Sequence, residues 1–193
     1  MITLAIIGAV IAIGMPYLSN RNTKTHAVLR ELSILSRELH TRAKLQGVVY
    51  RLVIDMGDEN KGDKAPQSFW VEKANGKTVV KAGEEDLAAD LAKETDPDKK
   101  TDPRGFEVDH QIIKQNKELP PGMRFDRVEL SRLKSAVTHG KAFIFYMPQG
   151  LVDEAAIHIK GDKTEAWTIS IHPLTGKAEV ISKQIGLKEI SSQ

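Results

Sequence analysis

The residues of this 193-residue chain that could do chemistry are its six histidines and their acidic or hydroxyl neighbours. Two metal ligands on one helix need an i, i+4 pair, and no two histidines have that spacing. Asp109-His110 and Ser170-x-His172 contain residue types used in metal binding or nucleophilic catalysis, but the sequence locates no third partner for either. It therefore favours solvated or partly packed histidines over a site at His26, His40, His110, His139, His158 and His172.

Composition excludes further kinds of site. The chain has no cysteine, so it has no disulfide framework, thiolate metal site or cysteine nucleophile. It has no glycine-rich loop of the kind that binds phosphate after a strand. A net charge of +2 with both signs interspersed gives no basic patch for nucleic acid. We therefore expect no enzymatic activity, no cofactor, no metal and no nucleic-acid partner.

The chain begins with an apolar segment that contains no charged side chain from Met1 to Asn20. At ~1.5 Å per helical residue, this length can cross a bilayer core of roughly 30 Å. The segment has neither the basic start nor the cleavage site of a signal peptide. Arg21 and Lys24 follow it, and the positive-inside rule would then leave the rest of the chain in the cytoplasm. We predict that residues 1–20 are the transmembrane part of a longer helix.

The next segment has the pattern of a helix with one apolar face. Charged residues separate four apolar positions that recur at spacings of four, three and four. Gly47 is a suitable stop, so one helix is expected from about Ile2 to Gln46, with Pro16 as a kink. Residues 21–46 would form an amphipathic stalk that packs on the protein's own sheet through Val28, Leu32, Leu35 and Leu39.

After Gly47 the apolar residues alternate with polar ones, which is typical of β-strands. Val48, Tyr50, Leu52 and Ile54 would face one way, which predicts a half-buried strand. The Pro173 to Gly176 stretch has the length and turn chemistry of a hairpin loop between the last two strands. Further strands are expected at 68–73, 106–113, 123–130, 141–147, 155–160, 167–172 and 177–181.

Two polar stretches interrupt this pattern. Residues 57–66 are expected to form a loop, and residues 82–105 a flexible surface excursion with one short helix. The predicted fold is therefore α+β, with a long N-terminal helix packed on a mostly antiparallel β domain over residues 47–193.

Stretches at both ends of the chain are similar to a known family. ITLAIIGAVIAIGMP resembles the N-terminal helix of type IV pilins and type II secretion pseudopilins. In this alignment, Gly8 and Pro16 correspond to the family's glycine and kinking proline, and Gly14 lies in the same span. FIFYMPQG, AAIHI and WTISIHPLTGKAEV resemble the closing strands of GspH/FimT-type minor pseudopilins. Their terminal hairpin corresponds here to Pro173, Thr175 and Gly176.

The resemblance implies a pilin-like fold and a non-catalytic structural subunit, a minor pseudopilin of a periplasmic pseudopilus in type II protein secretion. It implies a single pass through the bacterial inner membrane, with the C-terminal domain in the periplasm. The implied partners are other pseudopilin or pilin subunits, the inner-membrane assembly platform and membrane lipid through residues 1–20. Two alternatives stay open: a FimT-like minor pilin of a type IV pilus, and a membrane-anchored periplasmic ligand-binding domain.

The family register places Met1 at about the seventh residue of a mature subunit. It implies about six further mature residues that end in an acidic position, preceded by a glycine and a short leader with Lys or Arg. Positive charge upstream of Met1 would agree with the positive-inside rule.

Overall fold

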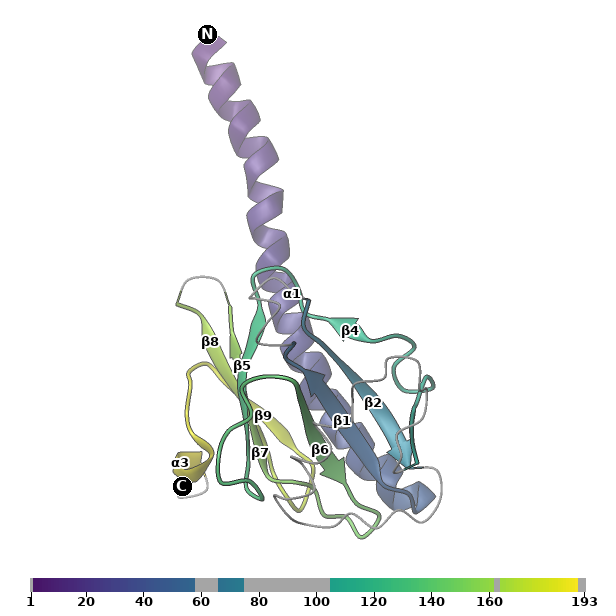
Figure 1. Cartoon of the computed structure of the whole chain (residues 1–193). Helices are drawn as coiled ribbons and strands as arrows, with labels where there is room; N and C mark the ends of the chain where they lie inside the picture. The colour runs from purple at the N-terminus through teal and green to yellow at the C-terminus, as the bar shows by residue number, and fades with distance from the viewer. Residues whose placement is uncertain (1, 58–65, 75–104, 162–163, 191–193) are drawn as a thin grey trace.

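The computed structural model describes residues 2–57, 66–74, 105–161 and 164–190, with side chains from residue 24 onward. Helix α1 (Ile2–Gln46) is continuous, and its first half projects from the domain while its second half lies along the strands (Figure 1). It ends at Gly47, whose φ of 68° is the left-handed conformation of a helix stop and whose N–H donates to the Ala43 carbonyl at 3.0 Å. The predicted helix bounds are confirmed.

The strands form two sheets in which every pairing is antiparallel. The first has the order β3 (Phe106–Val108), β2 (Ser68–Ala74), β1 (Tyr50–Asp55) and β6 (Lys141–Tyr146), with β4 (Lys117–Glu118) beside β2. The second has the order β5 (Arg124–Leu130), β7 (Ala155–Lys160), β8 (Ala166–Ile171) and β9 (Ala178–Ile181). The predicted α+β class with antiparallel strands is therefore confirmed.

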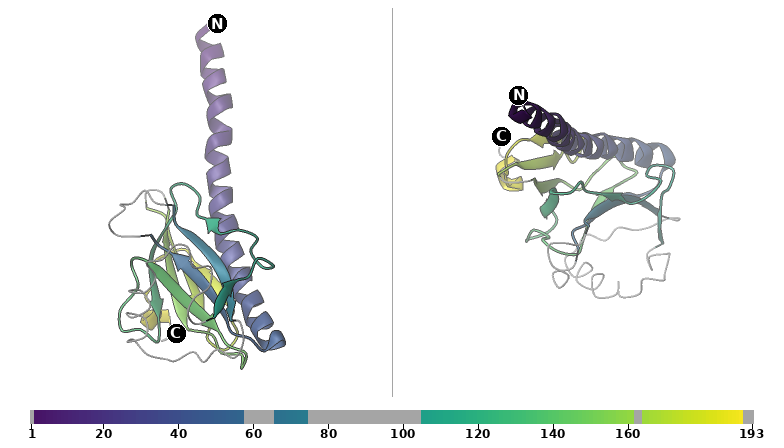
Figure 2. Two further views of the ribbon diagram at one scale, coloured as in Figure 1. Left: turned by 45° about the vertical axis from the view of Figure 1, so that its right-hand side comes forward. Right: turned by 90° about the horizontal axis from the view of Figure 1, so that it is seen from above.

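Helix α1 and the inner faces of both sheets enclose the main hydrophobic core. Figure 2 shows the helix lying along one side of the sheets. The helix contributes residues that recur every three or four positions, so they lie on one face. These buried residues are Leu29, Leu32, Leu35, Leu39 and Ala43.

Strand β1 differs from its prediction as a half-buried strand, because both of its faces are buried. Its even-numbered residues join the main core, while Val49 and Val53 belong to a second apolar cluster on the other face of the first sheet. The second face is buried because large side chains of the neighbouring strands β2, β3 and β6 pack beside it. The second cluster also contains Trp70, Ala74, Phe106, Phe143 and Phe145.

Arg51 lies within this second cluster and is 1% exposed. Its guanidinium carbon lies 4.1 Å and 4.5 Å from the ring centroids of Phe106 and Phe143. Its side chain also forms an ion pair with Glu72 on the paired strand β2. A buried cation is tolerated here because aromatic faces and a carboxylate surround it.

The strand predicted at 106–113 is shorter than expected. It ends at Val108 because Asp109 starts a turn: its Oδ1 accepts the Gln111 N–H at 2.9 Å and its carbonyl accepts the N–H of Ile112 at 3.3 Å. Two elements were not predicted, strand β4 and the short helix α3 (Leu187–Ile190).

Several predictions lie outside the described residues. They are the excursion at 82–105 except its last residue, and most of the loop at 57–66. Gly8, Gly14 and Pro16 lie within α1, in the part whose side chains are not described, as does the predicted transmembrane segment. Among the residues from 24 onward, whose side chains the structure describes, no helix combines the length and apolar character needed to cross a membrane.

Candidate functional site: the junction between the helix and two loops

The second half of α1 meets two loops of the β domain, and we call this contact region the junction. One loop follows β6 and covers residues 147–152, and the other joins β8 to β9 and covers residues 172–177. The loops are linked to each other, because the Val152 N–H donates to the Pro173 carbonyl at 2.8 Å. Two of the three stretches that carry the C-terminal family resemblance, FIFYMPQG and WTISIHPLTGKAEV, therefore lie against one another and against the helix.

The apolar stripe of α1 supplies the base of the junction. Leu32, Leu35 and Leu39 are 1%, 5% and 0% exposed, whereas Val28 is half-buried at the edge of the same core. Ile34, one position away from Leu35, points outward and is 55% exposed. The stripe thus packs on the protein's own strands.

Ser36 is a buried polar residue in the middle of this stripe. Its hydroxyl donates to the Gly176 carbonyl at 2.9 Å and accepts the Tyr146 hydroxyl at 3.0 Å. Burial raises the pKa of Tyr146, so this phenol stays a neutral donor. One serine therefore links the helix to β6 and to the hairpin loop by directional bonds.

His40 lies one turn further along α1 and contacts both loops. Its Nε2 is 3.0 Å from the Gly150 carbonyl, and because a carbonyl only accepts, we assign a proton to Nε2. Gly176 has a φ of 62°, and a Cβ added there would lie 2.5 Å from the His40 Cβ. Only glycine fits Gly176, for its backbone conformation and for the close approach of the helix.

The other predicted hairpin residues lie on the outside of this loop. Thr175 is exposed and its hydroxyl accepts the Lys177 N–H at 3.2 Å, which stabilises the turn. Pro173 is half-buried and takes part through its carbonyl. Their contribution to the junction is the shape of the loop, whereas Gly176 contacts the helix directly.

Arg132 and Asp153 join the two sheets next to the junction. Arg132 donates to Asp153 Oδ2 at 2.9 Å and to the Phe143 carbonyl at 2.7 Å. Asp153 Oδ2 also accepts the Phe145 N–H, and the Asp153 N–H donates to the Phe145 carbonyl. The pair thus bonds to backbone groups along β6 that a further strand would otherwise engage.

The residue pairs considered for chemistry do not form a site. His110 and His172 are exposed, and His172 Nδ1 accepts the Leu174 N–H at 3.3 Å within its own turn. Asp109 is 2% exposed and caps the turn after β3. In the described part of the chain, no three His, Asp or Glu residues are grouped as metal ligands would be.

The sequence did not single out Ser36 or Gly150, and it named His40 only among the histidines expected to be solvated or partly packed. The spacing of the buried positions 29, 32, 36, 39 and 43 is a signal that could have placed Ser36 on the buried face. No family model, no curated protein and no solved structure matches this chain.

Proposed function

We propose that this chain is a non-catalytic structural subunit of a pilus-like filament, specifically a minor pseudopilin of a type II secretion system. The observation that carries the proposal is the division of α1 into two halves. One half projects from the domain, and the other is packed on the β-sheets along its length (Figure 1). This is the arrangement that a pilin-like subunit needs to place one half of its helix among neighbouring subunits.

The junction supports this function mechanically. Leu32 and Leu39 bury their side chains in the core, and Ser36 and Gly176 add a directional bond between helix and hairpin. A force applied to the projecting half would pass to the domain, because the helix cannot turn without breaking these contacts. Subunits that grow or shorten a filament must transmit such forces.

The proposed location is the bacterial inner membrane, with residues 1–20 in lipid and the β domain in the periplasm. The proposed partners are other pseudopilin subunits and the inner-membrane assembly platform. Head-to-tail contacts between subunits generate a helical filament when the rotation does not close. A FimT-like minor pilin of a type IV pilus would have the same architecture and a different filament.

A gene deletion in the source bacterium, with complementation, tests the proposal. We expect the deletion to remove folded proteins from the culture supernatant and to leave them in the periplasm. Loss of surface pili with normal secretion would indicate the pilus alternative. Normal secretion together with normal pili would contradict both.

Cross-linking tests the filament contact directly, because the chain has no cysteine of its own. Ala12→Cys, in the projecting half of α1, should cross-link to other subunits of the filament in intact cells when its thiol carries a maleimide-linked benzophenone, which inserts into neighbouring C–H bonds on irradiation. His139→Cys, on an exposed loop of the β domain, serves as the matched control. A chain that stays monomeric with Ala12→Cys would contradict the proposed role.

A further inference from the structure

The C-terminal residues 182–190, which we call the strap, cross the face of the second sheet that points away from α1. The Lys183 carbonyl accepts the Thr168 hydroxyl at 2.8 Å, and the Ile185 N–H donates to Thr168 Oγ1 at 3.1 Å. The Leu187 N–H donates to Glu129 Oε2 at 2.8 Å. Ile185 and Leu187 are also buried, at 6% and 7% exposure. The strap is therefore held by hydrogen bonds to Thr168 and Glu129 and by the burial of two apolar side chains.

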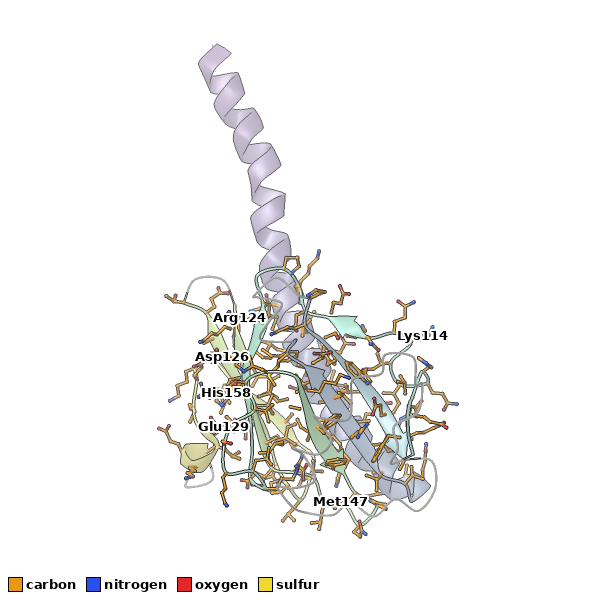
Figure 3. All side chains as sticks on the ribbon, in the orientation of Figure 1. Lys114, Arg124, Asp126, Glu129, Met147 and His158 are labelled. Atoms are coloured by element: carbon orange, nitrogen blue, oxygen red, sulfur yellow. The ribbon has the colours of Figure 1, made fainter. Side chains whose placement is uncertain are left out.

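His158 lies on the same face and is 0% exposed. It stands in a cross-strand row with Arg127 on β5 and Thr168 on β8. Its Nδ1 is 3.2 Å from Thr168 Oγ1, and its Nε2 is 3.0 Å from Glu129 Oε1 without the geometry of a hydrogen bond. Both residues that hold the strap are thus direct neighbours of this ring, and Figure 3 shows His158 close to Glu129 and Asp126.

Charged groups of β5 and β7 form ion pairs beside His158. Asp126 lies 2.6 Å from Lys160 and 3.4 Å from Arg127, and Glu129 lies 3.0 Å from Arg127. Two carboxylates therefore face two cations from β5 and β7, and β8 contributes only the Thr168 hydroxyl. A protonated His158 would pair with Glu129, whose Oε1 is 3.0 Å from its Nε2, and would add one positive charge to these groups.

The strap adds no charge of its own to this cluster. It presents backbone groups and the Gln184 amide, which bonds to Asp126 at 3.2 Å and to Arg127 at 3.4 Å. The side chains of its charged residues are exposed: Lys183, Lys188 and Glu189.

Burying a charge costs more than one additional hydrogen bond returns. Burial, followed by the Arg127 guanidinium, lowers the pKa of His158, while the Glu129 and Asp126 carboxylates act in the opposite direction. If the strap lifted, water would reach the ring and remove the burial cost. The closed strap therefore favours the neutral ring, and the open strap favours the protonated one.

We propose that the strap is a proton-sensitive latch, closed over neutral His158 and released when that ring takes up a proton. This inference does not depend on the proposed filament function. The latch is fully closed above the ordinary titration range of histidine. It weakens as the pH falls through that range, because the open form then binds a proton that the closed form does not.

Hydrogen exchange on the full chain in detergent micelles tests the latch. The exchange rates of peptides from residues 182–190 and from β8 are measured at several pH values between about pH 7.5 and pH 5. Each rate is corrected for the intrinsic pH dependence of exchange. We expect corrected exchange of the strap to rise about threefold or more on acidification, while β8 stays unchanged. A strap with constant corrected exchange would overturn the proposal.

Two variants locate the effect. His158→Gln cannot take up a proton, so its strap should exchange at the same corrected rate throughout the pH range. His139→Gln changes an exposed histidine away from the strap and should keep the response of the parent chain. The same acid response in His158→Gln and in the parent chain would overturn the proposal.

If His158→Gln does not fold, the parent chain still decides the question. The titration of the His158 ring, followed by NMR, should have its midpoint below the ordinary value for histidine and should coincide with the midpoint of strap release. A ring that titrates at or above the ordinary value, or a midpoint unrelated to strap exchange, would overturn the latch.

Discussion

The two faces of the second sheet are held in different ways. Its inner face presents Ile157 and Ile169 to the main core beneath α1, and both are 0% exposed. Its outer face presents Arg127, His158 and Thr168 to the strap. The inner contact depends on apolar burial, which is non-directional, whereas the outer contact adds to the burial of Ile185 and Leu187 several hydrogen bonds that need particular atoms.

The expected free energies differ accordingly. Full burial of a leucine side chain contributes about 1.5–3 kcal/mol, and several leucines of α1 are buried. A partly exposed ion pair contributes about 0.2–1 kcal/mol. Changes at the helix face should therefore decide whether the domain folds, while changes at the strap face should alter its response to pH.

The largest effect is expected from Leu35→Asp, which places a carboxylate in the main core, where Leu35 is 5% exposed. Loss of packing and burial of an unpaired charge should cost at least about 4 kcal/mol, so the chain should unfold or aggregate. Thermal unfolding followed by circular dichroism measures the loss of stability, and the yield of detergent-soluble protein measures aggregation.

Ile34→Asp is the matched control, because Ile34 is the adjacent residue and is 55% exposed. It should melt within a degree or two of the parent. If Leu35→Asp melted at the same temperature as the parent chain, the apolar stripe of α1 would be a partner interface and not part of the core.

A smaller loss is expected from Gly176→Ala at the junction. The new Cβ would meet the His40 Cβ at 2.5 Å, and alanine would also be strained at a φ of 62°. We expect a loss of about 2–4 kcal/mol in the free energy of unfolding, measured by chemical denaturation.

Gly47→Ala separates these two causes. Gly47 has a similar φ of 68°, but a Cβ there would have nothing within 4 Å. This variant should lose only the backbone contribution of about 1–2 kcal/mol. If Gly176→Ala and Gly47→Ala lost the same free energy of unfolding, the close contact between hairpin and helix would contribute nothing to stability.

Ser36→Ala tests the directional bonds within the otherwise apolar stripe. It removes the donor of the Gly176 carbonyl and the acceptor of the Tyr146 hydroxyl, both of which are buried. The expected loss is about 1–3 kcal/mol by chemical denaturation.

Tyr146→Phe added to Ser36→Ala should recover part of that loss, because no phenol hydroxyl is then left without an acceptor. Strictly additive losses in the double variant would show that the two hydroxyls do not interact.

The smallest effect concerns Asp126 on the outer face. Burial alone would raise the pKa of this carboxyl. Hydrogen bonds from Lys160 and Gln184, together with nearby cations, outweigh that effect and lower the pKa. Its contribution to stability is therefore present above the unfolded-state value near 3.8 and is lost as the pH falls below it.

The free energy of unfolding should change less between about pH 5 and pH 3 in Asp126→Asn than in the parent chain. The difference between the two changes should be less than about 1 kcal/mol. Glu179→Gln, an exposed acid on β9, should leave that dependence unchanged. An unchanged slope in Asp126→Asn would contradict the stabilising role of its contacts.

The sequence predicted most of the secondary structure, because periodicity and stop signals are local. The bounds of α1 followed from apolar spacing and from Gly47, and the strands β5 to β9 followed from alternation. The short strand β4 and the helix α3 were missed. Each has four residues or fewer, which is too short to establish a period.

The junction could be predicted only in part. The buried leucines of α1 and the hairpin glycine were visible in the sequence as separate features. Ser36 was not identified, since a serine among leucines carries no sign of which carbonyl it will meet. Its partner at Gly176 is 140 residues away along the chain.

The sequence by itself determined that a long helix precedes an antiparallel β domain, because those features depend on residues within a few positions of one another. Only the tertiary structure decided that β1 is buried on both faces, that Gly176 lies against His40 and that the strap bonds to both neighbours of His158. Each of these depends on the register of strands and on the packing of distant segments, which local spacing does not specify.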